Sequence, residues 1–162
     1  MQTFLPYSDF KLSARCLDKK RCFCQLKEAK QILCQLRASN LPKQWQESKD
    51  YLNQRYKNHP AVKMWVGYEE LLKYYYNIFL ECCLEKHRIN TTMIKLNVKE
   101  DDFPNLVKSP FWLHKEQFHR SHRSRLIAKD KNFYLSLFPD DENYNNSKYW
   151  WPDNDKKIFK II

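Results

Sequence analysis

The chain has 162 residues, of which 43% are hydrophobic, and this suits one domain, residues 1–162, with a sizeable core. Lys and Arg number 29 against 19 acidic residues, so the net charge of +10 favours a polyanionic partner, either nucleic acid or an anionic membrane surface. No apolar run approaches the roughly 18 residues of a spanning helix, and the first residues lack a signal-peptide pattern, so we expect an intracellular protein that does not span a membrane.

The first strong pattern runs from Arg15 to Arg37 and predicts a helix. Its core-facing positions, at the three and four spacing of a helix, are Leu26, Leu33 and Leu36. Upstream, Ser8 or Asp9 is placed to cap a helix start, so the N-terminus is expected to lie close to the first helix.

A second face of this helix carries Arg21, Gln25 and Glu28 at positions i, i+4 and i+7. Periodicity alone favours a solvated helix face with weak charge pairs. A functional carboxylate at Glu28 is the alternative, and it needs support from the rest of the chain.

Residues 40–58 are polar with scattered aromatics and predict a connector with a short helix between Gln46 and Tyr56. A second long helix is expected from Pro60 to about His87, capped by Asn58 or His59. Its apolar stripe consists of Ala61, Trp65, Tyr68, Leu72, Tyr75, Phe79 and Cys82. Gly67, the only glycine, falls inside this helix, where close helix packing is expected and close approach of a ligand is the alternative.

Residues 88–109 predict a long irregular connection. It contains the acidic run Glu100, Asp101 and Asp102, and then Pro104. A short strand is possible in residues 91–96, although no partner strand is evident.

A third helical stretch begins at Pro110, with Lys115, His119, His122 and Leu126 on one face. Arginines surround that face at positions 120, 123 and 125. Residues 115–131 hold six Lys or Arg against Glu116 and Asp130, the densest positive patch in the sequence.

The C-terminal tail interleaves aromatic and basic residues. Trp150 and Trp151 precede Lys156, Lys157 and Lys160. This pattern suits stacking on exposed bases with contacts to phosphates, and the alternative is that a tryptophan docks the tail onto the core.

The six cysteines form no CxxC pair, and no Cys or His group near them repeats a zinc spacing. We therefore expect small buried residues, without disulfides or zinc. His119 and His122 lack an acidic or cysteine partner at a suitable spacing, so no metal is expected there.

Several sequence blocks, in order along nearly the whole chain, resemble the pyrimidine-dimer DNA glycosylase family, typified by phage endonuclease V. The blocks are MQTFLPYSDF, ARCLDKKR with QLKEAKQIL, NHPAVKMWVGYEELL, FHRSHRSRLIAKDKNFY and YWWP. The branch that is most similar occurs in bacteria and large DNA viruses. The combination is specific, although each block alone is weak.

The resemblance implies a compact all-helical domain that binds and kinks duplex DNA and opens the base stack at the lesion. It implies that an N-terminal α-amine attacks C1′ of the damaged nucleotide and forms a covalent imine, assisted by a glutamate on the first helix. That glutamate matches Glu28, preceded here by Lys27 where the phage enzyme has an arginine. Gln2 is too large for the usual removal of the initiator methionine, so Met1 is expected to supply the amine, with processed Gln2 as the other possibility.

The resemblance also assigns His59 near the site, where a helix cap is the competing interpretation. His119 and His122 with Arg123 would form a second pocket wall or a phosphate clamp. The full set expected to contact DNA is Arg21, Gln25, Lys27, His59, Lys63, His119, His122, Arg123, Arg125, Trp150 and Trp151.

The sequence therefore predicts an all-α domain of about three main helices, with long irregular connections and an aromatic C-terminal tail. The expected function is a DNA repair glycosylase with abasic-site lyase activity on ultraviolet pyrimidine dimers. It would act as a monomer on double-stranded DNA, without cofactor, obligate protein partner or membrane. Two alternatives stay open: a non-catalytic binder of damaged or distorted DNA, and a glycosylase for another modified base.

Overall fold

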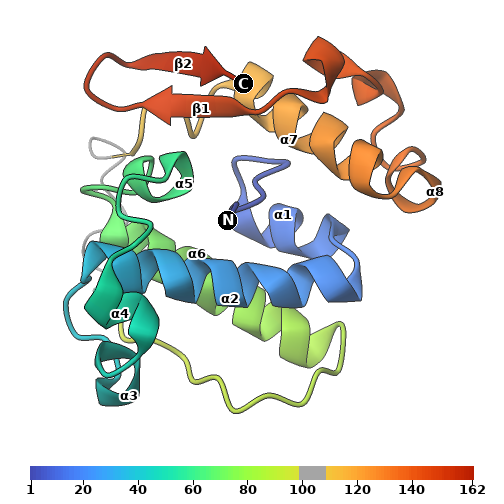
Figure 1. The fold of residues 1–162 in the computed structure, drawn as a ribbon. Coiled ribbons are helices and arrows are strands. Elements are labelled where there is room, and N and C mark those ends of the chain that lie inside the picture. The colour runs from blue at the N-terminus through green and yellow to red at the C-terminus, as the bar shows by residue number, and fades with distance from the viewer. Residues whose placement is uncertain (99–108) are drawn as a thin grey trace.

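Two long helices, α2 (Lys19–Leu36) and α6 (Glu69–Glu85), pack against each other at the centre of the fold (Figure 1). The computed structural model describes residues 1–98 and 109–162, so the predicted acidic run and Pro104 lie outside the described residues. The other elements are α1 (Phe10–Cys16), α3 (Lys43–Gln46), α4 (Lys49–Asn53), α5 (Pro60–Lys63), α7 (Glu116–Lys129), α8 (Lys131–Tyr134), the 3₁₀ turns η3 (Pro139–Asp141) and η4 (Tyr144–Ser147), and the strands β1 (Trp150–Asp153) and β2 (Ile158–Ile161). The predicted all-α class is confirmed, with one small hairpin added to it.

The N-terminal segment lies between two layers of the structure. Figure 1 shows α1, α2 and α6 on one side of it, and α7 with the hairpin on the other. The N-terminal segment therefore lies between α2 and α6 on one side and α7 on the other, and side chains of these three long helices can reach it.

The predicted helix from Arg15 to Arg37 is two helices, because a second cap interrupts it. Asp9 accepts the amide of Leu12 and starts α1. Leu17 then adopts an extended backbone, and Asp18 accepts the amide of Arg21 to start α2. The predicted core positions Leu26 and Leu33 are fully buried, while Leu36 is only partly buried.

The predicted helix from Pro60 to about His87 is also broken, at Gly67. Gly67 adopts φ +80° between α5 and α6, and a Cβ built on it would meet no atom within 4 Å. The expected close helix packing at Gly67 is therefore wrong, and glycine is explained by its backbone conformation instead. The apolar stripe hid this break because both helices turn apolar side chains toward the same core.

The described part of the long connection, residues 88–98, contains no strand, so the strand considered for residues 91–96 does not form. Asn77 of α6 holds this segment, because its side chain donates to the carbonyl of Leu96 and accepts the Leu96 amide, both at 2.8 Å. The third helix begins at Glu116 rather than at Pro110.

The C-terminal tail forms an antiparallel hairpin that the sequence did not reveal. Trp151 pairs with Lys160, and Trp150 pairs with Ile161. Trp151 is 9% exposed and belongs to the core, so the expectation that a tryptophan docks the tail is confirmed. Asn154, in the turn, donates to the carbonyls of Lys63 and Met64 and thereby fixes the hairpin against α5.

No helix in the described ranges has the length and apolar character needed to cross a membrane.

Candidate active site

The N-terminal segment is held in place by side chains from α2, α6 and the turn after α5. The amide of Phe4 donates to Gln25 Oε1 at 2.7 Å, and the Tyr75 hydroxyl lies 2.8 Å from the same oxygen and 3.0 Å from the Phe4 carbonyl. Trp65 Nε1 donates to the Thr3 hydroxyl at 3.0 Å. These contacts are buried, and they pair the backbone of Phe4 and the hydroxyl of Thr3 without help from water.

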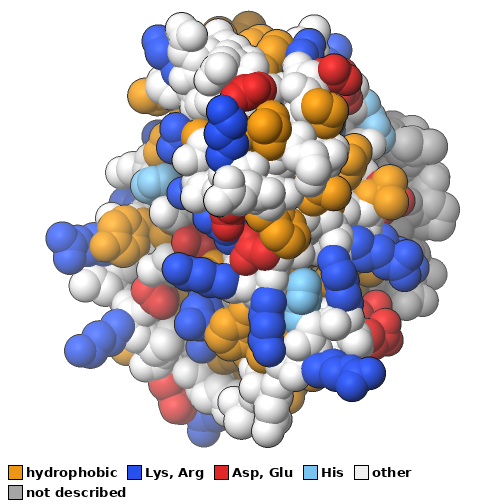
Figure 2. All heavy atoms as spheres, turned by 90° about the vertical axis from the view of Figure 1, so that its right-hand side faces the viewer, with side chains coloured by type: hydrophobic (Ala, Val, Ile, Leu, Met, Phe, Trp, Pro, Cys, Tyr) orange, Lys and Arg blue, Asp and Glu red, His pale blue; other side chains and the backbone are white. Residues whose placement is uncertain are grey.

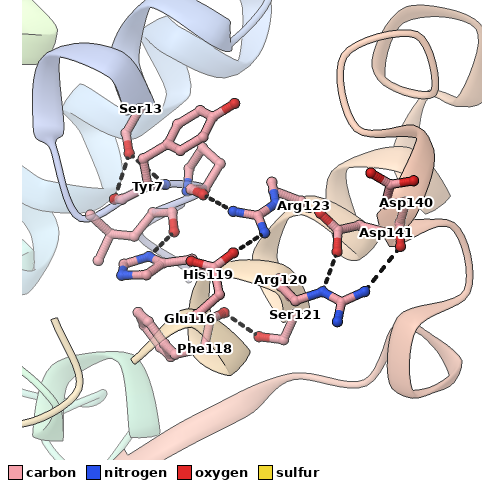
Figure 3. Close-up of polar contacts among 12 residues, drawn as sticks. Tyr7, Ser13, Glu116, Phe118, His119, Arg120, Ser121, Arg123, Asp140 and Asp141 are labelled. Atoms are coloured by element: carbon pink, nitrogen blue, oxygen red, sulfur yellow. Dashed lines mark hydrogen bonds and ion pairs between the residues drawn. The ribbon is translucent and has the colours of Figure 1, made fainter. Parts of the chain in front are cut away.

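Helix α7 holds the same segment from the other side. His122 Nδ1 accepts the Leu5 amide at 2.9 Å, and Arg123 donates to the Pro6 carbonyl at 2.8 Å. His119 Nδ1 lies 2.7 Å from the Leu5 carbonyl (Figure 3). Three side chains of α7 therefore fix the backbone a few residues beyond the terminal amine.

Burial keeps these histidines neutral. Desolvation lowers the pKa of His122 well below its usual value, and the nearby His119 and Arg123 lower it further. A neutral ring also agrees with the bond to Leu5, because Nδ1 can accept that amide only without a proton. Burial likewise lowers the pKa of His119, although both of its ring nitrogens face carbonyl oxygens, so a neutral His119 can donate to only one.

The terminal amine and the predicted catalytic carboxylate meet. The α-amino nitrogen of Met1 lies 3.9 Å from Oε2 of Glu28, and the Gln2 amide donates to the same oxygen at 3.2 Å. The side chain of Glu28 is 30% exposed, so the carboxylate faces both the N-terminus and solvent. A neutral amine and a carboxylate at this separation are the two groups that imine chemistry needs.

The pair opens into a cavity of about 540 Å³. Of the predicted site residues, the cavity is lined by Met1, Arg21, Gln25, Glu28, His59 and Trp151. Residues from α2, α5 and β1 thus converge on the terminal amine, although they are far apart in the sequence.

His59 satisfies both interpretations of its role. Its Nδ1 accepts the Ala61 amide at 3.1 Å and caps α5, and its ring also lines the cavity against Trp151, with ring centres 5.9 Å apart. Burial lowers the pKa of His59, and the positive charge of the N-terminal amine adds to this effect. The shift agrees with a position close to the amine.

Arg123 is not free to bind a phosphate in this conformation. Its guanidinium makes ion pairs with Asp141 and with Glu116, the latter at 2.5 Å, and Asp141 also pairs with Arg120 at 2.6 Å (Figure 3). Three of the six cations of the expected positive patch, Arg120, Arg123 and Lys131, therefore have acidic partners. With His119 and His122 buried, the wall or clamp expected of these three residues is instead an anchor for the N-terminal segment.

The other predicted contacts lie outside the cavity. Lys27 and Lys63 are exposed. Arg125 stacks on the Tyr149 ring at 4.3 Å and donates to the Ser147 carbonyl. Trp150 packs on Phe159 and Tyr144.

Sequence reasoning missed several residues that line the cavity. These are Phe4, Lys20, Cys24, Lys129 and Tyr149, whereas Gln2 was expected only as an alternative source of the amine. Lys20 and Cys24 could have been found, because they precede Glu28 at i−8 and i−4 on the same helix. Lys129 and Tyr149 gave no local signal, since tertiary packing brings them to the site. Burial, followed by the charges of Arg125 and Arg21, lowers the pKa of Lys129.

On the face shown in Figure 2, Lys and Arg side chains are spread over the surface, with Asp and Glu side chains among them. At the cavity itself, Lys20 and Lys129 contribute positive charge around Glu28, while Arg21 is paired with Asp18 at 2.7 Å and with Asp130 at 3.6 Å. Such an arrangement attracts a polyanion to the mouth of the cavity.

Comparison with known proteins gave one match. A family model described as pyrimidine dimer DNA glycosylase matches residues 1–95, which include Met1, Glu28 and His59. Neither the curated proteins nor the solved structures that were compared contain a significant match.

Proposed function

The chain belongs to the pyrimidine dimer DNA glycosylase family, and from this premise we propose that it excises ultraviolet pyrimidine dimers from duplex DNA and then cleaves the abasic strand. In this proposal the α-amine of Met1 is the nucleophile and Glu28 is the general acid and base. DNA binding and glycosylase function follow from the family. The lyase activity and the covalent imine are the parts that experiment must test.

One observation carries the proposal: the Met1 amine and the Glu28 carboxylate meet, 3.9 Å apart, at the wall of a cavity. Contacts from three helices fix the segment that bears the amine, so little conformational freedom remains to be lost when a substrate binds. The carboxylate lies close enough to exchange protons with the amine through a small movement or one water molecule.

The proposed reaction proceeds through an imine. The neutral amine attacks C1′ of the damaged nucleotide, the bond from C1′ to the base breaks, and the base leaves with the electron pair and takes up a proton. The nitrogen loses one proton to Glu28, and Glu28 gives that proton to O4′ as the C1′–O4′ bond breaks, so that the sugar ring opens and a protonated imine forms. Removal of a C2′ proton then breaks the C3′–O bond and cleaves the strand, and water releases the enzyme.

Met1 is the assigned nucleophile because Gln2 disfavours its removal. If Met1 were nevertheless removed, the nitrogen of Gln2 would become the amine, and it already lies 3.2 Å from Glu28 Oε2. Intact-mass measurement of the N-terminus decides which nitrogen is the free amine, and the proposed chemistry is the same for both.

The surroundings of the cavity suit a distorted DNA strand. Lys20 and Lys129 can neutralise phosphates on one side, and the rings of Tyr149 and Trp151 form an aromatic wall. His59 lies against that wall as a further polar group. We propose that the damaged nucleotide enters between the basic and aromatic sides.

Borohydride trapping tests the proposal. The full chain is incubated with ultraviolet-irradiated, abasic, alkylated and undamaged duplexes of one sequence, and cross-linked protein is counted on denaturing gels. We expect trapping on irradiated and abasic DNA and none on undamaged DNA. Binding without any trapping would support a non-catalytic binder, and trapping on alkylated but not irradiated DNA would support a glycosylase for another base.

A further inference from the structure

A cluster of cysteine and histidine side chains lies where α2 and the end of α6 meet. Cys22, Cys82 and His87 place their ligand atoms within 4.8 Å of one another. A third thiol borders the group, because Sγ of Cys83 lies 3.5 Å from Sγ of Cys22. None of the four lines the cavity that contains Glu28.

His87 supplies a second observation that points to a ligand. Its Nε2 atom is buried and has no hydrogen-bond partner. The backbone of Leu17 hydrogen-bonds the ring. Buried ring nitrogens are usually paired, and a histidine held by a backbone carbonyl with its other nitrogen free is the common arrangement of a metal ligand.

The separations suit a small thiophilic cation. With Zn–S bonds of about 2.3 Å and Zn–N bonds of about 2.0 to 2.1 Å, tetrahedral ligand atoms lie roughly 3.5 to 3.8 Å apart. The cluster is within about 1 Å of this geometry, since its three ligand atoms are separated by at most 4.8 Å. Rotation about side-chain torsions is enough to close that difference.

We propose that Cys22, Cys82 and His87 bind one Zn²⁺ ion. Two thiolates and one imidazole supply three of the four ligands that zinc takes, and this combination of soft thiolate and imidazole donors suits the metal. The site lies outside the proposed imine chemistry and does not depend on it.

The surroundings allow a metal to reach the cluster. A cavity of about 460 Å³ between α1 and α6 is lined by Cys82, Arg15 and Lys86, among others, and gives access to Cys82 from solvent. Zinc binds the thiolate form, so metal binding releases the thiol protons.

Such a site would fasten the early part of α2 to the end of α6. Cys22 is in the second turn of α2, the helix that also carries Glu28, and Cys82 and His87 flank the end of α6. Metal binding is therefore expected to stabilise the folded chain, because the ligands are brought together only on folding.

The test uses the full chain, reduced, freed of metal with a chelator, and titrated with Zn²⁺ or Co²⁺. We expect one equivalent to bind, with a melting temperature that rises with Zn²⁺ concentration. Co²⁺ should give thiolate-to-metal charge-transfer absorption and the intense visible bands of tetrahedral coordination. Absence of binding by the reduced protein would overturn the proposal, as would a Co²⁺ spectrum without thiolate bands.

Two matched variants locate the site. His87→Ala removes a ligand near the surface. Losing a hydrogen-bond partner of a metal ligand typically weakens affinity by about 10- to 100-fold, so losing the ligand itself should weaken Zn²⁺ affinity by more than that. Cys34→Ala removes another buried cysteine of α2, outside the cluster, and should leave affinity unchanged. Equal Zn²⁺ affinity in both variants would overturn the assignment. A disulfide between Cys22 and Cys83 in the untreated protein, together with no metal binding after reduction, would also overturn it.

Discussion

His122 accepts the backbone N–H of Leu5 through Nδ1, at 2.9 Å, and so joins α7 to the segment that ends in the terminal amine. The family match covers residues 1–95, so the groups of the proposed chemistry lie inside it and this anchor lies outside it. The position of the amine therefore depends on a helix far from it in the sequence. The first two predictions concern this anchor.

The first prediction concerns pH. Unfolded histidine takes up a proton below about pH 6.5, whereas buried His122 resists protonation, so the free energy of unfolding should fall as pH drops below about 6.5. His122→Asn keeps an acceptor for Leu5 but does not titrate, and should reduce this slope by up to about 1.4 kcal/mol per pH unit. Urea unfolding at pH 7.5, 6.5 and 5.5 measures how the free energy of unfolding depends on pH. The exposed His114→Asn is the control, and an unchanged slope in His122→Asn would contradict the prediction.

The second prediction concerns Asp141, whose carboxylate pairs with Arg123 and Arg120 and is 5% exposed as a residue. Asp141→Asn leaves the buried guanidinium of Arg123 with Glu116 as its one remaining acidic partner. The free energy of unfolding should therefore fall by about 3 kcal/mol, the lower end of the range for breaking a buried ion pair. Asp140→Asn is the control, because its residue is exposed and only its backbone accepts a bond from Arg120. Similar denaturation midpoints for the two variants would show that the buried network contributes little.

Helical periodicity identified the residues that share a face but not what each face meets. The face containing His119 and His122 was predicted, yet whether it pointed to DNA or to the N-terminal segment depended on residues far away in the sequence. Glu28 was found because the resemblance selected it from a local pattern. By contrast, no fixed spacing reveals the pairing of Arg123 with Asp141, or of Cys22 with Cys82 and His87, since folding alone brings them together.

The third prediction concerns the basic residues at the cavity. Binding to duplex DNA should weaken by roughly a thousandfold between 50 and 200 mM salt if about six phosphates are contacted. Lys20→Gln with Lys129→Gln should lower the slope of log affinity against log salt by about 1.8, or about 0.9 for each lost contact. The control pair, Lys43→Gln with Lys49→Gln, makes the same charge change near the other end of α2. Equal slopes in the two pairs would place the DNA elsewhere.

The fourth prediction concerns the carboxylate. Glu28→Gln keeps the size of the side chain but removes its charge and its titrating proton. Turnover on irradiated DNA should fall by about 10²- to 10⁴-fold, while DNA affinity stays level or rises because a negative charge near phosphates is gone. Single-turnover cleavage and equilibrium binding separate the two effects. Unchanged turnover would return Glu28 to the solvated helix face that periodicity alone favoured.

The last prediction concerns the amine itself. A residue added before Met1 moves the amine by about 3.8 Å, which is as large as its present 3.9 Å separation from Glu28 and too far for an attacking geometry. Acetylation keeps the nitrogen in place but removes its nucleophilicity. Both changes should abolish borohydride trapping and strand cleavage, while salt-sensitive DNA binding should persist because Lys20, Arg21 and Lys129 are unchanged.

The acetylated protein also distinguishes the amine from the nearest rival nucleophile. Lys129 lines the same cavity, and burial and neighbouring arginines lower its pKa, so it is the lysine most able to form an imine there. Trapping on abasic DNA is therefore measured for acetylated protein with and without Lys129→Gln. If Met1 is the nucleophile, acetylation alone removes all trapping, and Lys129→Gln alone removes none. Trapping that survives acetylation but is lost with Lys129→Gln would transfer the covalent role to Lys129.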